Sequence, residues 1–203
     1  MDDLLALLRS IEQVYRRAPD GPLAAAATRI AGVKQADLRA GQGKRKPVAQ
    51  FVDRAVDVGR RGPLSAIADA FAAVEPRSDW LQNPNYSVAT LGPGYVDRYG
   101  YVELIGPGRP VESADLLVGL LLLGPEMHYP DHAHPAEEIY HVVAGHADWW
   151  REGEGWRRKP PGSVIHHAPM MRHAMRTKDE PLLALYCWTG DVKTYATMTE
   201  AGR

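Results

Sequence analysis

Three things are scarce in this sequence of 203 residues: cysteine, an excess of charge of either sign, and long apolar runs. Cys187 is the single cysteine, which excludes a disulfide within the chain and leaves the redox compartment open. The net charge of −1 gives no indication of binding to nucleic acid or to an anionic membrane surface. The longest apolar run, 116–124, has the length of a strand and is too short to cross a bilayer.

The first nine residues carry acidic side chains where a signal peptide would be basic, and Arg9 interrupts their apolar run. A cytoplasmic protein is therefore the simplest expectation. At 22.4 kDa the chain corresponds to one domain, or to one domain with an extension.

The periodicity of apolar residues changes at Glu75–Pro76. Before this point the spacing predicts four helices, at 2–18, from Leu23 to about 35–38, at 48–59 and at 63–74. After it, short segments rich in aromatic and β-branched residues alternate with turns, which predicts antiparallel strands. The expected strands are 79–81, 99–105, 115–123, 139–143, 147–150, 156–159, 164–167, 173–177 and 182–188. We therefore expect a helical segment, 1–75, packed on a β barrel, 76–203.

The stretch from His128 to Gly145 is the richest in chemistry, because it contains His132, His134, Glu138 and Tyr140. All four have even numbers, and residues of one parity share a face of an extended strand. We expect Pro135 to bend the chain, and the four side chains to converge on one side of a strand pair. Two histidines and one carboxylate form a ligand set for a divalent transition metal.

The spacing H-x-H-x3-E-x6-G from His132 to Gly145 resembles the first motif of the cupin family. A second cupin-like motif follows, with a Pro161–Gly162 turn, a strand and then His173 at the position of the fourth ligand. The resemblance implies a mainly β fold, the double-stranded β-helix or jelly-roll barrel of cupins, with His132, His134, Glu138 and His173 as metal ligands. A histidine-rich strand end with solvated imidazoles would not account for the paired turns.

The first motif, extended to include Tyr129 and Tyr140, resembles the cupin-type dimethylsulfoniopropionate (DMSP) lyases, and their DddQ-like branch in particular. The helical N-terminal segment, the second motif and Trp188 also fit that branch. The resemblance implies cleavage of DMSP to dimethyl sulfide and acrylate. Tyr140 is then the candidate base, Tyr129 a second candidate that also helps to bind substrate, and Trp188 a residue that binds the sulfonium by cation–π attraction.

The implied cofactor is one divalent transition metal per chain, and Zn²⁺, Fe²⁺ and Mn²⁺ all accept this ligand set. The implied partner is a small-molecule substrate; the oligomeric state stays open, with a homodimer among the states allowed. Two other functions remain as alternatives. One is an Fe(II) cupin oxygenase, and the other is a non-catalytic metal cupin that senses a ligand.

Overall fold

The computed structural model describes residues 1–18 and 20–199 of the chain. Helices dominate its N-terminal part, in the order α1 (Asp2–Tyr15), α2 (Gly21–Ala31), α3 (Val52–Gly59) and α4 (Ser65–Val74). Short 3-10 helices lie at Gln35–Asp37, Pro47–Phe51 and Glu75–Arg77, and two further short helices, α5 (Val88–Leu91) and α6 (Pro93–Val96), lie between the first two strands.

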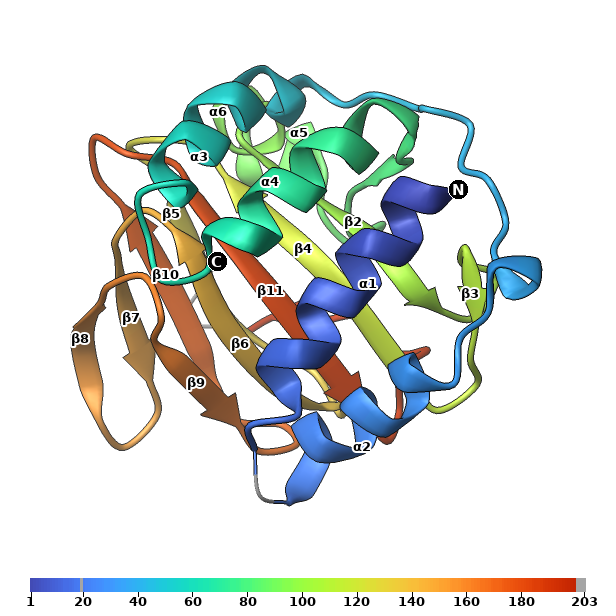
Figure 1. Cartoon of the computed structure of the whole chain (residues 1–203). Helices are drawn as coiled ribbons and strands as arrows, with labels where there is room; N and C mark the ends of the chain where they lie inside the picture. The colour runs from blue at the N-terminus through green and yellow to red at the C-terminus, as the bar shows by residue number, and fades with distance from the viewer. Residues whose placement is uncertain (19, 200–203) are drawn as a thin grey trace.

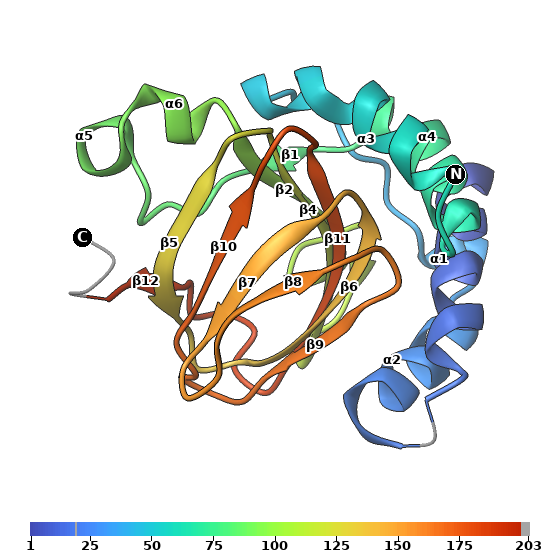
Figure 2. The same ribbon diagram turned by 90° about the vertical axis from the view of Figure 1, so that its left-hand side faces the viewer.

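The strands form two sheets that face each other and enclose the interior of a barrel (Figure 2). The seven-stranded sheet has the order β1-β2-β4-β11-β6-β9, with β3 beside β2, and the five-stranded sheet has the order β12-β5-β10-β7-β8. The first sheet consists of β1 (Trp80–Leu81), β2 (Tyr99–Gly106), β3 (Val111–Glu112), β4 (Leu116–Leu123), β6 (Glu137–Ala144), β9 (Val164–His167) and β11 (Leu182–Thr189). The second consists of β5 (His128–Ala133), β7 (Ala147–Arg151), β8 (Gly155–Lys159), β10 (His173–Thr177) and β12 (Thr197–Met198).

Helices α1 to α4 cover the outer face of the seven-stranded sheet, and α1 and α4 lie across β4 and β11 in Figure 1. Strand β11 separates two hydrophobic cores because alternate side chains point to opposite faces. Leu183, Leu185 and Cys187 belong to the core beneath the helices, which also contains Tyr15 of α1. Leu182, Ala184 and Tyr186 belong to the core inside the barrel.

This architecture confirms the prediction of a mainly β, cupin-type barrel with N-terminal helices. The predicted strands are all present, with ends shifted by one or two residues. The first two helices are shorter than predicted and end at Tyr15 and Ala31. The helices α5 and α6, and the strands β3 and β12, were not predicted, because each is too short to carry a periodic pattern. Strand β5 was also missing from the expected strands, because its histidines and Pro130 do not form an apolar pattern. Within the described residues, no helix is both long and apolar enough to cross a membrane.

Candidate metal centre and pocket

Three of the four predicted ligand residues come together inside the barrel. His134, Glu138 and His173 each offer one ligand atom, these atoms lie within 4.8 Å of one another, and all three residues are buried. His134 lies in the link between β5 and β6, Glu138 near the start of β6, and His173 at the start of β10. The group therefore bridges the two sheets.

The predicted reason for this convergence was wrong. We expected the even-numbered residues around Pro135 to share one side of a strand pair. In the structure β5 and β6 do not pair with each other, because β5 lies in the five-stranded sheet and β6 in the seven-stranded sheet. The residues meet because two sheets face each other across the interior, and not because of their parity within one sheet.

The histidine rings are oriented by the local backbone. In His132, His134 and His173 the Nδ1 atom lies at hydrogen-bond distance from a carbonyl oxygen two residues away, so Nδ1 carries the proton and donates it. Nε2 is then left with a lone pair, which is the form that binds a metal. The three pairs are His132 with Pro130 (2.8 Å), His134 with Ala136 (3.0 Å) and His173 with Met171 (2.9 Å).

A cation fits between these acceptors. Nε2 of His134 lies 3.1 Å, and Nε2 of His173 3.4 Å, from Oε2 of Glu138. In the neutral tautomer with the proton on Nδ1, which is the form that binds a metal, neither Nε2 atom has a proton to donate to the carboxylate. The buried Nε2 atom of His173 also has no hydrogen-bond partner among the described residues. Unpaired buried acceptors are costly, and a divalent metal bound by two imidazoles and a carboxylate would satisfy all of them.

Glu138 is held from both neighbouring strands. His167 on β9 and Trp188 on β11 lie directly opposite Glu138 on β6. Trp188 donates from Nε1 to Oε1 of Glu138 (2.6 Å), and His167 lies with Nδ1 2.8 Å from Oε2. Nε2 of His167 accepts a hydrogen bond from Nε1 of Trp149 (3.1 Å), so the proton of His167 is on Nδ1 and points to the carboxylate. The flanking strands thus fix both oxygens of Glu138.

The charges of this centre follow from burial. Burial lowers the pKa of His167 to about 3, so this imidazole is neutral at ordinary pH. Burial by itself would raise the pKa of Glu138, but the neighbouring imidazoles hold it well below its usual range. The centre therefore presents the negative charge of Glu138, supported by the neutral imidazole of His167, to a bound cation.

His132, the fourth predicted ligand, is not one of the three residues grouped by distance. Its ring lies edge-on to His173, with centroids 4.1 Å apart, and is stacked on Tyr129 at 4.0 Å. A β-bulge brings Tyr129 and His132 to the same face. Three steps along β5, from Tyr129 to His132, pair with only two along β10, from Met175 to His173. Whether His132 binds the metal stays a prediction.

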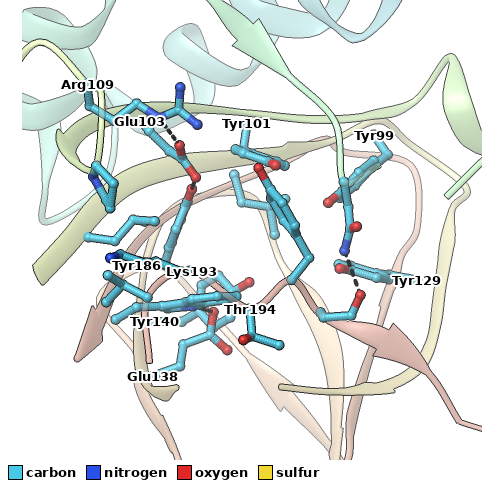
Figure 3. Close-up of a pocket in the computed structure, with 18 residues that line it drawn as sticks. Tyr99, Tyr101, Glu103, Arg109, Tyr129, Glu138, Tyr140, Tyr186, Lys193 and Thr194 are labelled. Atoms are coloured by element: carbon cyan, nitrogen blue, oxygen red, sulfur yellow. Dashed lines mark hydrogen bonds and ion pairs between the residues drawn. The ribbon is translucent and has the colours of Figure 1, made fainter. Parts of the chain in front are cut away.

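A pocket of about 260 Å³ opens beside the metal centre, and Glu138 forms part of its wall. Tyr140, Tyr129 and Trp188 also line it, so each of the other predicted site residues reaches the same space. Figure 3 shows Tyr140 close to Glu138 and Tyr129 on another side of the pocket. One face of the Trp188 indole stacks on His134, with ring centroids 4.1 Å apart.

Neither Tyr140 nor Tyr129 ionises readily unless a cation lies nearby. Burial and the charge of Glu138 raise the pKa of Tyr140 well above its usual value. Burial and neighbouring tyrosines do the same to Tyr129, whose hydroxyl donates to that of Tyr86 (3.2 Å). A phenol here can act as a base only if a cation close to its oxygen stabilises the phenolate.

Sequence reasoning did not identify His167 as a partner of Glu138, nor Tyr86 as a partner of Tyr129. The sequence allowed one of His166 and His167 to face the site, but the choice depends on how β9 pairs with β6. Tyr86 lies in the segment before α5, which carried no recognisable motif. Tertiary contacts, and not local patterns, place both residues.

Comparisons with known proteins agree with this geometry. Residues 24–184 match the family described as dimethylsulfoniopropionate lyase. The chain is 38% identical over 135 residues to the dimethylsulfoniopropionate lyase DddQ of Ruegeria pomeroyi, a match that covers 66% of each chain. It is 31% identical over 199 residues to the DddL protein of Cereibacter sphaeroides, covering 93% of this chain and 82% of that protein.

The crystal structure of DddQ from Ruegeria pomeroyi superimposes on the whole fold. The TM-score is 0.81 at 30% sequence identity, and the match covers 100% of this chain and 98% of the other. The helical segment and the barrel are therefore both shared with that structure.

Proposed function

This chain belongs to the DMSP lyase family of carbon–sulfur lyases, in its DddQ-like branch, and from that premise we propose that it cleaves DMSP by β-elimination to dimethyl sulfide and acrylate. The observation that supports this most is the buried group of His134, Glu138 and His173 beside a pocket lined by Tyr140. Elimination needs a proton removed next to a carboxylate, a group that takes the proton, and a site that holds the cationic leaving group.

His134, Glu138 and His173 would hold one divalent metal, with His132 as the fourth predicted ligand. When bound, the metal supplies a Lewis acid for the carboxylate of the substrate, which offsets the negative charge that develops as the neighbouring carbon loses its proton. Trp188 and His167 keep the Glu138 carboxylate in place through their two hydrogen bonds. The donors do not select one metal, because Zn²⁺, Fe²⁺ and Mn²⁺ all accept them, so the supply of each metal decides which one binds.

Tyr140 is the proposed base. Its phenolate oxygen takes the proton from the carbon next to the substrate carboxylate, the electron pair forms the carbon–carbon double bond, and the carbon–sulfur bond breaks. Dimethyl sulfide then leaves with both electrons of that bond. Tyr129, stacked on His132 and lining the same pocket, is the second candidate for this proton transfer.

Tyr129 and Trp188 are also the proposed binding residues for the sulfonium. A sulfonium has no proton to donate in a hydrogen bond, so aromatic faces suit it better than polar acceptors. Of these two, Trp188 has one indole face covered by His134 and its Nε1 edge bonded to Glu138, which leaves its other face for the substrate. We further propose that residues 1–75 support the barrel and contribute no catalytic group, because they contain neither histidine nor cysteine.

The direct test is headspace detection of dimethyl sulfide from the purified, metal-loaded protein supplied with DMSP. We expect dimethyl sulfide and acrylate in equal amounts, without consumption of oxygen. Oxygen uptake that accompanies turnover would instead support an Fe(II) oxygenase. Tight binding of DMSP without either product would support a ligand-sensing role.

A further inference from the structure

A row of inward-facing residues crosses the seven-stranded sheet and ends at a second buried carboxylate. Glu103 on β2 lies opposite Gly119 on β4, Gly119 lies opposite Tyr186 on β11, and Tyr186 lies opposite Tyr140 on β6. Glu103, Tyr186 and Tyr140 all line the pocket. The row thus leads from the proposed base across the pocket to Glu103.

Gly119 allows the middle of this row to form. A Cβ atom at position 119 would lie 2.7 Å from the hydroxyl oxygen of Tyr186, closer than a side chain tolerates. Without that atom, the Tyr186 ring lies over β4, and its hydroxyl donates to Oε1 of Glu103 (3.4 Å). Figure 3 shows Tyr186 reaching toward Glu103, with Glu138 at the opposite end of the pocket.

Burial of the Glu103 carboxylate costs the protein stability. Its side chain is 5% exposed, and burial raises the pKa of its carboxyl group, whereas Arg109 and Tyr186 oppose that rise. A buried ion pair is seldom a net gain in stability, because desolvation offsets the attraction. A β-bulge between Glu103 and Ile105 further distorts β2 at this point, a device that often redirects a side chain. These features suggest a role in binding.

We propose that Glu103 is the residue that selects a cationic substrate, by providing the negative charge that faces the sulfonium end. This rests on the proposed function, in which the carboxylate end of the substrate is held at the metal. The cationic end then extends past Trp188, the proposed sulfonium contact beside Glu138, toward Tyr186, whose ring centroid lies 6.4 Å from that of Trp188. Tyr101 and Glu103 line the pocket on the far side of Tyr186. Tyr101 and Tyr186 add aromatic faces there, with ring centroids 6.3 Å apart.

The ion pair with Arg109 does not cancel this charge. Arg109 also lines the pocket, but its side chain is 27% exposed, against 5% for Glu103, so solvent screens the guanidinium more than the carboxylate. Glu103 is buried where it lines the pocket, and charge interactions away from bulk solvent are stronger than at the surface. Arg109 and Tyr186 thus oppose the rise in pKa that burial causes and orient the carboxylate, which still lines the pocket and can attract a cation.

The test compares two non-native ligands of one shape: the trimethylammonium analogue of DMSP, and its uncharged isostere in which carbon replaces the quaternary nitrogen. Their dissociation constants are measured by calorimetry on the metal-loaded protein. We expect the wild type to prefer the charged ligand by roughly tenfold or more, as for other close charge pairs. Glu103→Gln should remove most of that preference by weakening the charged ligand alone, and Glu103→Asp should retain it.

Glu112→Gln is the matched control. Glu112 lies on β3, next to the turn that carries Arg109, and pairs with Arg39 (3.4 Å) on the exposed side. It does not line the pocket, so the preference should not change. If Glu103→Gln leaves Arg109 unpaired and prevents folding, the double variant Glu103→Gln/Arg109→Met carries the same expectation. An equal loss of affinity for both ligands, or an unchanged preference, would overturn the proposal.

The two proposals can fail separately. If the protein releases dimethyl sulfide but shows no charge preference that depends on Glu103, the lyase assignment stands and the role of Glu103 is refuted. If it shows that preference but releases no dimethyl sulfide, the lyase assignment fails and Glu103 remains the group that selects a cation.

Discussion

Replacing Tyr140 with phenylalanine tests the proposed base with the smallest change available. The variant removes one hydroxyl and keeps the ring, which packs against Trp149 and Tyr186 with centroids 5.0 Å and 6.0 Å away. Because these ring contacts do not need the hydroxyl, the free energy of unfolding should change by less than about 1 kcal/mol. Thermal unfolding and elemental analysis should find the fold and the metal retained.

Turnover should fall by roughly 10²–10⁴-fold in Tyr140→Phe, the usual cost of losing a general base. This corresponds to about 2.7–5.5 kcal/mol in the activation barrier. The assay is the initial rate of dimethyl sulfide release at saturating DMSP. A variant that keeps its metal and more than about a tenth of wild-type turnover, a loss under ~1.4 kcal/mol, would refute the assignment and make Tyr129 the leading candidate.

The pH dependence gives an independent readout. Burial and Glu138 raise the pKa of Tyr140, so the phenol is protonated, and inactive as a base, until a cation or a higher pH favours the phenolate. The wild-type rate should therefore rise with pH as Tyr140 loses its proton, and this rising limb should vanish or move in Tyr140→Phe. Tyr129→Phe should cost less activity. Tyr95→Phe, which removes a buried hydroxyl without a partner among the described residues, should cost none.

Three further predictions concern the supports of the site. Glu138→Gln should lose most of the bound metal by elemental analysis, whereas Glu137→Gln should keep it, because Glu137 bonds instead to the exposed side chain of His166 (2.8 Å); the reverse result would mean that the register of β6 is wrong. His167→Phe should weaken metal binding by roughly 10–100-fold in competition with a chelator, and an unchanged affinity would show that Glu138 needs no support from β9. Ile11→Ala, at a fully buried position of α1, should lower the free energy of unfolding in urea by about 2–5 kcal/mol with the metal retained; metal loss in the folded variant would show that the helical segment shapes the site.

The sequence was most informative where a local pattern decides the structure. The apolar stripe of α1 follows directly from the helical period of 3.6 residues. The candidate ligand residues His134, Glu138 and His173 were identified from motif spacing, because a metal site needs particular donor side chains and the motif fixes their order along the chain. The boundary between helices and strands near Glu75 was also predicted, since the spacing of apolar residues changes there.

What could not be predicted depends on how strands pair. The hydrogen bond from His167 to Glu138 exists because β9 lies beside β6 in one register, and a shift by one residue would place His166 there instead. The bulge in β5 brings Tyr129 and His132 to the same face, against the parity expected of a regular strand. No motif in the sequence marked Glu103 as a site residue, because its position beside the pocket depends on Gly119 and Tyr186 on two other strands.

The buried position of Cys187 makes its thiol a reporter of whether the helical layer opens. This thiol is fully buried on the helix side of β11, and burial raises its pKa to about 12, so a thiol reagent can reach the reactive thiolate only when the helices lift from the sheet. The rate of labelling under native conditions therefore measures the opening equilibrium of residues 1–75 without any engineered probe. Labelling that proceeds faster than global unfolding, while bound metal is retained, would show that the helical layer opens as a unit of its own.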